Sequence, residues 1–265
     1  MFERQFLSKG DDILYRSEFT DAAAEQLAAD YGCYKQDFFA EENIVVPNKS
    51  KSGSRTIFDE TPFFRMATMG RNAVISADER LIPFFAQLCE KYSGAEMFSG
   101  KVQYLVNCKL AEYNKSIGDT NIYYLPDIPY KYHRKSGVNL KVFEENEIKS
   151  QLYPHKEFTN ALLYKDQGKR TDKVAVCALN GNDIIAMAGA SSDSERFWQI
   201  GIDVKKEFRG LGIGSECVKA LTYEVMAHGA IPYYGTWSGN IASQNVARTT
   251  AYRPAWTEMF AQKIN

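Results

Sequence analysis

Residues 202–215 read IDVKKEFRGLGIGS, and this stretch decides the fold. It follows a strand-like segment, 197–204, and leads into an amphipathic segment, 211–228, that is typical of a helix. Its glycines let backbone N–H groups come close to a ligand. The start of a helix adds unpaired N–H donors and the positive end of the helix dipole. We therefore predict an anion site at this strand-to-helix junction, suited to a pyrophosphate.

Two other phosphate-binding loops fit these residues less well. A Walker A loop ends in Gly-Lys-Ser/Thr, and no lysine follows Gly214. A dinucleotide loop has the spacing Gly-x-Gly-x-x-Gly, but counting onward from Gly210 leads to Ser215, and from Gly212 to Cys217. A glycine-rich turn without a ligand is the remaining alternative.

The segments around this loop predict a mixed α/β layer built on one sheet. Alternate residues of 197–204 point to opposite faces, so Ile202 and Val204 face one side while Gln199 and Asp203 face the other. Asn180-Gly181 indicates a hairpin with a type I′ turn. We expect strands at 173–179, 184–190, 197–204, 231–235 and 256–262, and helices at 211–228 and 242–251.

The first half of the chain is less regular. Two prolines, a charge cluster and Gly137 follow residue 125, which favours a linker and a boundary near residue 135. We therefore predict an α+β domain of unassigned role at 1–134 and a second domain at 135–265. We expect helices at 18–31 and 78–92, strands at 63–68, 73–76 and 122–125, and a solvated loop at 47–55.

Composition excludes several classes of function. The net charge of −1 provides no strong field toward nucleic acid or a membrane surface. The five cysteines are odd in number and widely separated, which argues against disulfides and zinc pairs. The three histidines form no metal or triad pattern. A polar start and no long apolar run lead us to expect a cytoplasmic protein without a metal.

The loop resembles the signature of the GNAT superfamily of acyl-CoA-dependent N-acyltransferases. Arg209-x-x-Gly212-x-Gly214 is similar to its Arg/Gln-x-x-Gly-x-Gly/Ala motif, and Asn240-Ile241-Ala242-Ser243 is similar to its Asn-x-x-Ser/Ala segment. The resemblance covers about residues 137–265. It implies a mixed, largely antiparallel sheet flanked by helices, preceded here by a smaller α+β domain.

The resemblance also implies acetyl-CoA as co-substrate. Backbone N–H groups from Arg209 to Ser215 would hold the pyrophosphate, the strand end at Val204 would pair with the pantetheine arm, and Asn240 and Ser243 would line the arm near the thiol. The expected cofactor-binding residues are Ile202, Val204, Arg209, Gly210, Leu211, Gly212, Ile213, Gly214, Ser215, Asn240 and Ser243.

The sequence departs from the family pattern at the proton donor. Many members carry a tyrosine about seven residues after the asparagine, and that position is Ala247 here. We predict Tyr252 as the acid, with Tyr233, a water molecule or departure of the thiolate without a donor as alternatives, and Asp203 as the general base. A structural role for the Asp203 carboxylate is an equal alternative.

The expected function is transfer of an acetyl group to a primary amine of a small molecule by direct attack, with residues 1–134 forming a wall of the acceptor site, a regulatory unit or a dimerisation piece of a homodimer. The alternatives are a non-catalytic acyl-CoA sensor or scaffold, which Ala247 favours, and a protein N-acetyltransferase.

Overall fold

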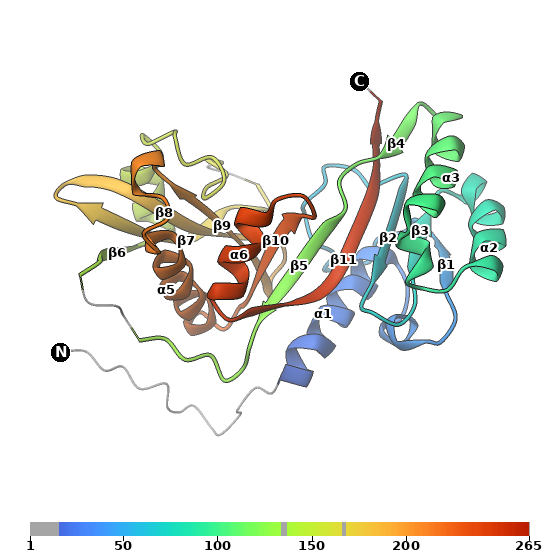
Figure 1. Cartoon of the computed structure of the whole chain (residues 1–265), viewed down its shortest axis with the longest axis horizontal. Helices are drawn as coiled ribbons and strands as arrows, with labels where there is room; N and C mark the ends of the chain where they lie inside the picture. The colour runs from blue at the N-terminus through green and yellow to red at the C-terminus, as the bar shows by residue number, and fades with distance from the viewer. Residues whose placement is uncertain (1–15, 134–136, 166–167, 265) are drawn as a thin grey trace.

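The computed structural model describes residues 16–133, 137–165 and 168–264. Its centre is one twisted mixed sheet (Figure 1). Within the described residues, the pairs β1–β3 and β9–β10 are parallel and the other strand pairs are antiparallel. The strand order is β1 (Ile44–Pro47), β3 (Val74–Ala77), β2 (Phe64–Thr68), β11 (Tyr252–Lys263), β5 (Asn121–Pro126), β10 (Ile231–Trp237), β9 (Phe197–Val204), β8 (Asp183–Ser192), β7 (Asp172–Asn180) and β6 (Asn139–Glu144), with β4 (Lys115–Ile117) paired to β11.

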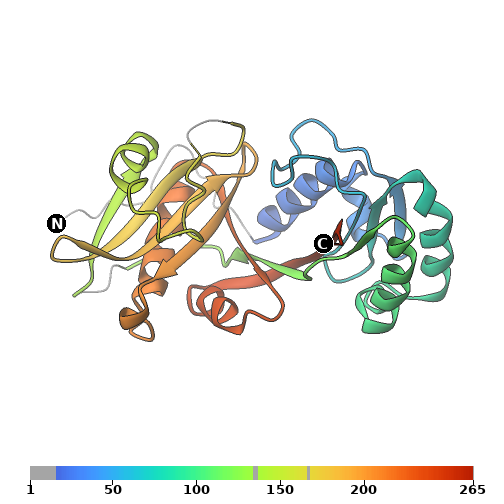
Figure 2. The ribbon, with the colours of Figure 1, turned by 90° about the horizontal axis from the view of Figure 1, so that it is seen from above.

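Helices cover both faces of the sheet, as expected of a mixed layer. Figure 2 shows α1 (Arg16–Tyr31) on one side and α5 (Ile213–Ala227) with α6 (Ile241–Thr249) on the other. The segment of α4 (Glu145–Glu147) and the following π-helical turn (Ile148–Leu152) packs on the side of α1. The predicted fold class, a largely antiparallel mixed sheet flanked by helices, is confirmed.

Alternating side chains explain why each face has its own core. Ile200 and Tyr234 pack under α5, whereas their neighbours Phe197 and Tyr233 pack under α1. A third core joins α2 (Ile82–Lys91) and α3 (Gly100–Ala111) to β2, β3 and β11. The period-2 pattern of the strands thus buries both sheet faces.

Strand β5 connects the two halves of the chain. It lies before the predicted boundary at residue 135, yet it pairs antiparallel with both β10 and β11 (Figure 1). Tyr123 stacks on Trp256 on the α1 face with ring centroids 4.9 Å apart, and Tyr124 enters the core under α5. One sheet therefore runs through both predicted domains, and the division at 134/135 stays a prediction.

Several elements differ from the sequence expectation. The helix predicted at 78–92 is a 3₁₀ turn, Glu79–Leu81, followed by α2, because Pro83 suits only the first turn of a helix. The last strand, predicted at 256–262, already begins at Tyr252 and contains a bulge between Pro254 and Trp256. The elements α3, β1, β4, β6 and α4 were not predicted.

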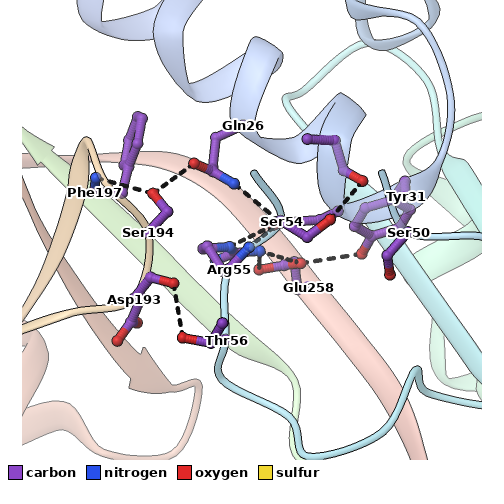
Figure 3. A network of polar contacts seen from close by, with 12 residues as sticks. Gln26, Tyr31, Ser50, Ser54, Arg55, Thr56, Asp193, Ser194, Phe197 and Glu258 are labelled. Atoms are coloured by element: carbon purple, nitrogen blue, oxygen red, sulfur yellow. Dashed lines mark hydrogen bonds and ion pairs between the residues drawn. The ribbon is translucent and has the colours of Figure 1, made fainter. Parts of the chain in front are cut away.

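The loop predicted to be solvated, 47–55, ends in a buried cation. The Arg55 side chain is 2% exposed, and its Nη2 lies 2.9 Å from the Glu258 carboxylate (Figure 3). The Arg55 Nε donates to the Asp30 carboxylate. The prediction was wrong at Arg55 because both carboxylates lie far from it in sequence. These ion pairs tie the loop to α1 and β11.

Candidate active site

A cleft opens where β9 and β10 stop pairing. Their parallel register runs from Phe197↔Ile231 to Ile200↔Tyr234, and beyond it the strands separate. The cleft between them has a volume of about 1000 Å³. The strand β9 remains paired to β8 over the same stretch, so the ends of β9 and β10 diverge while each stays supported on its outer side.

The glycine-rich loop closes one end of this cleft. Val204 ends β9, a 3₁₀ turn at Lys206–Phe208 follows, and the Arg209 Nε donates to the Val204 carbonyl at 3.0 Å. Gly210 and Gly212 both adopt φ +78°, a left-handed conformation that side-chain-bearing residues rarely take. The guanidinium bond and the two left-handed turns therefore shape the loop before α5 begins.

The loop presents its backbone donors to open space. An added Cβ at Gly210 or Gly212 would meet no atom within 4 Å, so the outer side of the loop is free. Glu216 N donates to Gly212 O at 3.2 Å as the first helical bond, and N–H groups before it lack such a helical acceptor. This arrangement fits a pyrophosphate, whose oxygens accept such bonds.

Gly214 has a different reason to be glycine. A Cβ there would lie 2.8 Å from the Val204 Cγ2 atom, so the helix approaches β9 more closely than any side chain would allow. Of the other loop residues predicted to bind the cofactor, Ile213 and Ser215 line the cleft, whereas Leu211 is not among the lining residues and is 63% exposed.

Helix α6 forms the opposite wall. Asn240 caps it, because its Oδ1 accepts from Ser243 N at 3.0 Å. The Ser243 hydroxyl lies 2.9 Å from the Tyr234 hydroxyl, and the Ser215 hydroxyl lies 3.2 Å from that of Thr249. Both predicted α6 residues, Asn240 and Ser243, line the cleft together with Ile202 and Val204.

The cleft has two chemically different halves because strand residues alternate. The half under α5 and α6 carries Ile202, Val204 and Tyr234. Gln199 pairs with Tyr233, whose ring belongs to the opposite face, so Gln199, Gly201 and Asp203 face away from α5. The cleft passes through the sheet from the face of the loop to the face of α1.

Asp203 faces this second half but already carries three hydrogen bonds. Its carboxylate accepts from Asn160 N at 2.7 Å, from Asn160 Nδ2 at 2.6 Å and from Ala161 N at 3.2 Å. The backbone of 160–161 crosses the sheet at Gly201 and Gly189, where a Cβ would collide with its carbonyl oxygens. In this structure Asp203 holds the crossing segment.

Residues 141–252 match the sequence model of the Acetyltransferase (GNAT) family. This part of the chain is a GNAT acetyltransferase domain. No functionally curated protein matches the chain by sequence.

Solved structures with a related name also resemble the chain. A GCN5-related N-acetyltransferase from Kribbella flavida is 14% identical, with a TM-score of 0.47 over 93% of this chain and 96% of that one. A GCN5-related N-acetyltransferase-like protein from Streptococcus suis 89/1591 is 14% identical, with a TM-score of 0.40 over 60% and 68%. A GNAT-family acetyltransferase from Colwellia psychrerythraea is 14% identical, with a TM-score of 0.40 over 60% and 62%.

The GNAT domain does not bring the predicted acid to the cleft. Tyr252 is 2% exposed, is not among the residues that line the cleft, and shares a 2.8 Å hydrogen bond with the Thr222 hydroxyl inside the core. Burial raises the pKa of Tyr252 well above its ordinary value. Tyr233, the alternative, is also fully buried, and its hydroxyl donates to Asp193.

The position of the missing tyrosine, Ala247, lies on the face of α6 that packs into the core, and it is fully buried. The phenol that does line the cleft is Tyr234, which sits at the last position of β10 that pairs with β9. Its place in a strand next to the motif Asn240 was the available sequence signal. Burial raises the pKa of Tyr234, so its hydroxyl is protonated at neutral pH.

Two further findings concern metal binding and membrane spans among the described residues. No group of three or more His, Cys, Asp or Glu side chains gathers there as a metal site. None of the helices described combines the length and apolar character that crossing a bilayer requires.

Proposed function

We propose that this protein is an N-acetyltransferase that transfers the acetyl group of acetyl-CoA to a primary amine of a small molecule. The observation that carries the proposal is the cleft between β9 and β10, with backbone donors of Gly210–Ser215 at one end and an open polar half on the opposite face. A cofactor and an acceptor can thus approach one point from two sides.

The residues of the loop half suit the cofactor. The N–H groups at the start of α5 would take the pyrophosphate, and the unpaired inner edge of β9 at Gly201–Val204 would bond the extended pantetheine arm as an added strand does. Acetyl-CoA supplies an acyl thioester, an activated form of the acetyl group. Asn240 and Ser243, the other expected binding residues, line the same cleft and would contact that arm.

The reaction balances without a further reagent. The neutral amine nitrogen attacks the thioester carbonyl carbon, the C–N bond forms, the C–S bond breaks, and the amine proton leaves as the thiolate gains one. We assign the donated proton to Tyr234, which lines the cleft and is linked to Ser243 at 2.9 Å. Tyr252, predicted from the sequence, is as buried as Tyr234, since both are 2% exposed, but it is not among the residues that line the cleft.

The proton of the amine would be removed in the half of the cleft that faces away from α5. Asp203 stays the predicted base, and a carboxylate has about four acceptor positions, of which three are taken by Asn160 and Ala161. The position left over would receive the proton directly or through a water molecule.

A second candidate function is a non-catalytic acyl-CoA sensor. The buried alanine at position 247, where many family members have a tyrosine, favours it. In that case the cleft would hold the cofactor, and Tyr234 would only line it.

The two functions differ in thiol release. The protein is incubated with acetyl-CoA and a panel of amines, and free thiol is followed with a thiol reagent, while a thermal shift measures cofactor binding separately. The proposed transferase releases thiol with at least one amine above the rate without amine. A cofactor-induced shift without release for any amine would reject the transferase and support the sensor.

A further inference from the structure

Gln199 occupies the point where β9 and β10 separate. It faces away from α5, lines the cleft and lies beside Gly235, whose added Cβ would come within 3.0 Å of the Gln199 Nε2 atom. The missing side chain at Gly235 therefore leaves room for the Tyr123 ring, whose atoms would be nearest to an added Cβ, and for this amide.

The orientation of the amide follows from its neighbours. The Arg170 Nη2 donates to Gln199 Oε1 at 3.0 Å. A guanidinium has only donors, so the amide must turn its oxygen toward Arg170 and its NH₂ group the other way. Among the described residues no protein acceptor bonds to Gln199 Nε2, and the group is left as a free donor beside Gly235.

An ion pair between the partly exposed Arg170 and the buried Asp193 holds this arrangement. The Arg170 Nε bonds the Asp193 carboxylate, which is fully buried and also accepts from the Tyr233 hydroxyl. Burial raises the pKa of Asp193, while the Arg170 charge acts in the opposite direction. The Thr56 hydroxyl donates to the Asp193 backbone carbonyl at 3.1 Å, so the N-terminal half supports the same network (Figure 3). The contacts of Arg170 and Asp193 thus fix the position of the Gln199 amide.

Among the described residues that line the cleft, the acceptor half carries one charged side chain, that of Asp203. The charged residues that line the cleft are Asp203 and Arg209, and Arg209 belongs to the cofactor loop. Three donors already engage the Asp203 carboxylate. The other polar groups on this face are the amides of Asn121, Asn160 and Gln199. A second positive charge on a substrate would lose its hydration here without a free counter-ion.

We propose that Gln199 determines acceptor specificity by donating from Nε2 to an uncharged oxygen of the substrate. The acceptor class is a monoamine that bears hydroxyl or amide groups, such as an amino sugar or an amino-acid amide, and not a polyamine or another polycation. This inference rests on the proposed function for the location of the acceptor, and it specifies the substrate class of that site.

Binding tests the inference without turnover. The full-length protein is saturated with CoA, and dissociation constants are measured by calorimetry for glucosamine, glycinamide, ethylenediamine and spermidine. We expect glucosamine or glycinamide to bind at least tenfold more tightly than the two polyamines. Comparing the dissociation constants of glucosamine and glycinamide then shows whether the partner of Gln199 is a hydroxyl or an amide.

Two variants and one control test the residue itself. Gln199→Leu removes the donor and should weaken the preferred amine by about tenfold, the value of one hydrogen bond. Gln199→Glu replaces the donor by a carboxylate and should shift the preference toward ethylenediamine. Gln103→Leu, on α3, loses an amide remote from the cleft and should leave all four constants unchanged.

A wild-type preference for polyamines, equal affinity for all four amines, or no binding of any would overturn the inference. Unchanged selectivity in both Gln199 variants would overturn it as well, provided that each variant keeps its CoA-induced thermal shift as proof of folding. Selective binding without thiol release from acetyl-CoA would reject the proposed function while leaving this assignment of the acceptor class in place.

Discussion

We predict that Gly201→Ala detaches the segment 158–162 from the sheet and weakens acceptor binding. An added Cβ would lie 1.8 Å from the Asn160 carbonyl oxygen, whereas ordinary van der Waals contact begins at 3.4 Å. The segment must therefore retreat by about 1.6 Å, since Gly201 lies in the middle of β9 and is held by β8.

The magnitude follows from the bonds that this movement breaks. Asp203 accepts at 2.6, 2.7 and 3.2 Å from the same segment, and hydrogen bonds do not survive a displacement of that size. Hydrogen bonds to a charged group contribute about 1.5–3 kcal/mol each. Because the partly exposed carboxylate can follow the segment or turn to water, we expect a loss of roughly 2–4 kcal/mol in the free energy of unfolding.

Chemical denaturation measures this loss, and steady-state thiol release measures the KM for the acceptor, which should rise at least tenfold. The CoA-induced thermal shift should remain, because the loop 209–215 lies on the opposite face. Gly100→Ala is the matched control: nothing lies within 4 Å of its added Cβ, so its stability should change by less than about 0.5 kcal/mol. Unchanged stability and KM in Gly201→Ala would refute this account of the segment.

Three further substitutions probe other parts of the site. Gly212→Glu should abolish the CoA-induced thermal shift, because a carboxylate and a left-handed non-glycine residue would fill the pyrophosphate position; an unchanged shift would contradict the loop assignment. Tyr234→Phe should lower kcat by about 100-fold with little change in KM for acetyl-CoA. Because the pKa of Tyr234 is raised, its hydroxyl keeps its proton near neutral pH, and deprotonation of Tyr234 should not lower wild-type activity there. A larger kcat loss in Tyr252→Phe would favour the sequence-predicted acid instead. Arg55→Met should lower the free energy of unfolding by about 3–5 kcal/mol, since Asp30 and Glu258 would stay buried without their cation. The control Lys49→Met removes only an exposed ion pair with Glu79 at 4.0 Å and should leave the stability nearly unchanged. Equal melting curves for the two variants would disprove the role of Arg55.

Sequence patterns predicted the regular elements of the C-terminal half well. The helix expected at 211–228 is Ile213–Ala227, and the hairpin at Asn180-Gly181 joins β7 to β8. Both depend on local signals, namely hydrophobic periodicity for the helix and a turn-forming glycine for the hairpin. The predicted type I′ turn was wrong, because it needs positive φ at both central residues, and among residues 180–183 Gly181 alone has it, with φ +60°. The N-terminal half was predicted less well, and α3 was missed although its buried residues Val102, Val106 and Leu110 recur every four residues, the spacing of a helix face.

No local signal in the sequence predicted which strands pair with β5. Its residues 121–126 read as a strand, but nothing in them identifies β10 and β11 as its partners. Strand pairing between distant segments depends on which aromatic side chains complete the two cores, here Tyr123 against Trp256 and Tyr124 beside Tyr234 and Tyr252. The buried state of Arg55 has the same origin, because its partners are 25 and 203 residues away.

The sequence by itself determined the loop at 209–215, because the glycines, the helix start and the preceding strand are contiguous and their conformations are set locally. Only the tertiary structure decided the acceptor half. Gln199, Arg170, Asn121 and Asn160 come from four separate segments and meet where β9 and β10 diverge. Their chemistry depends on which face each strand turns toward the cleft and on which neighbour orients each amide, and both depend on pairings across the whole sheet.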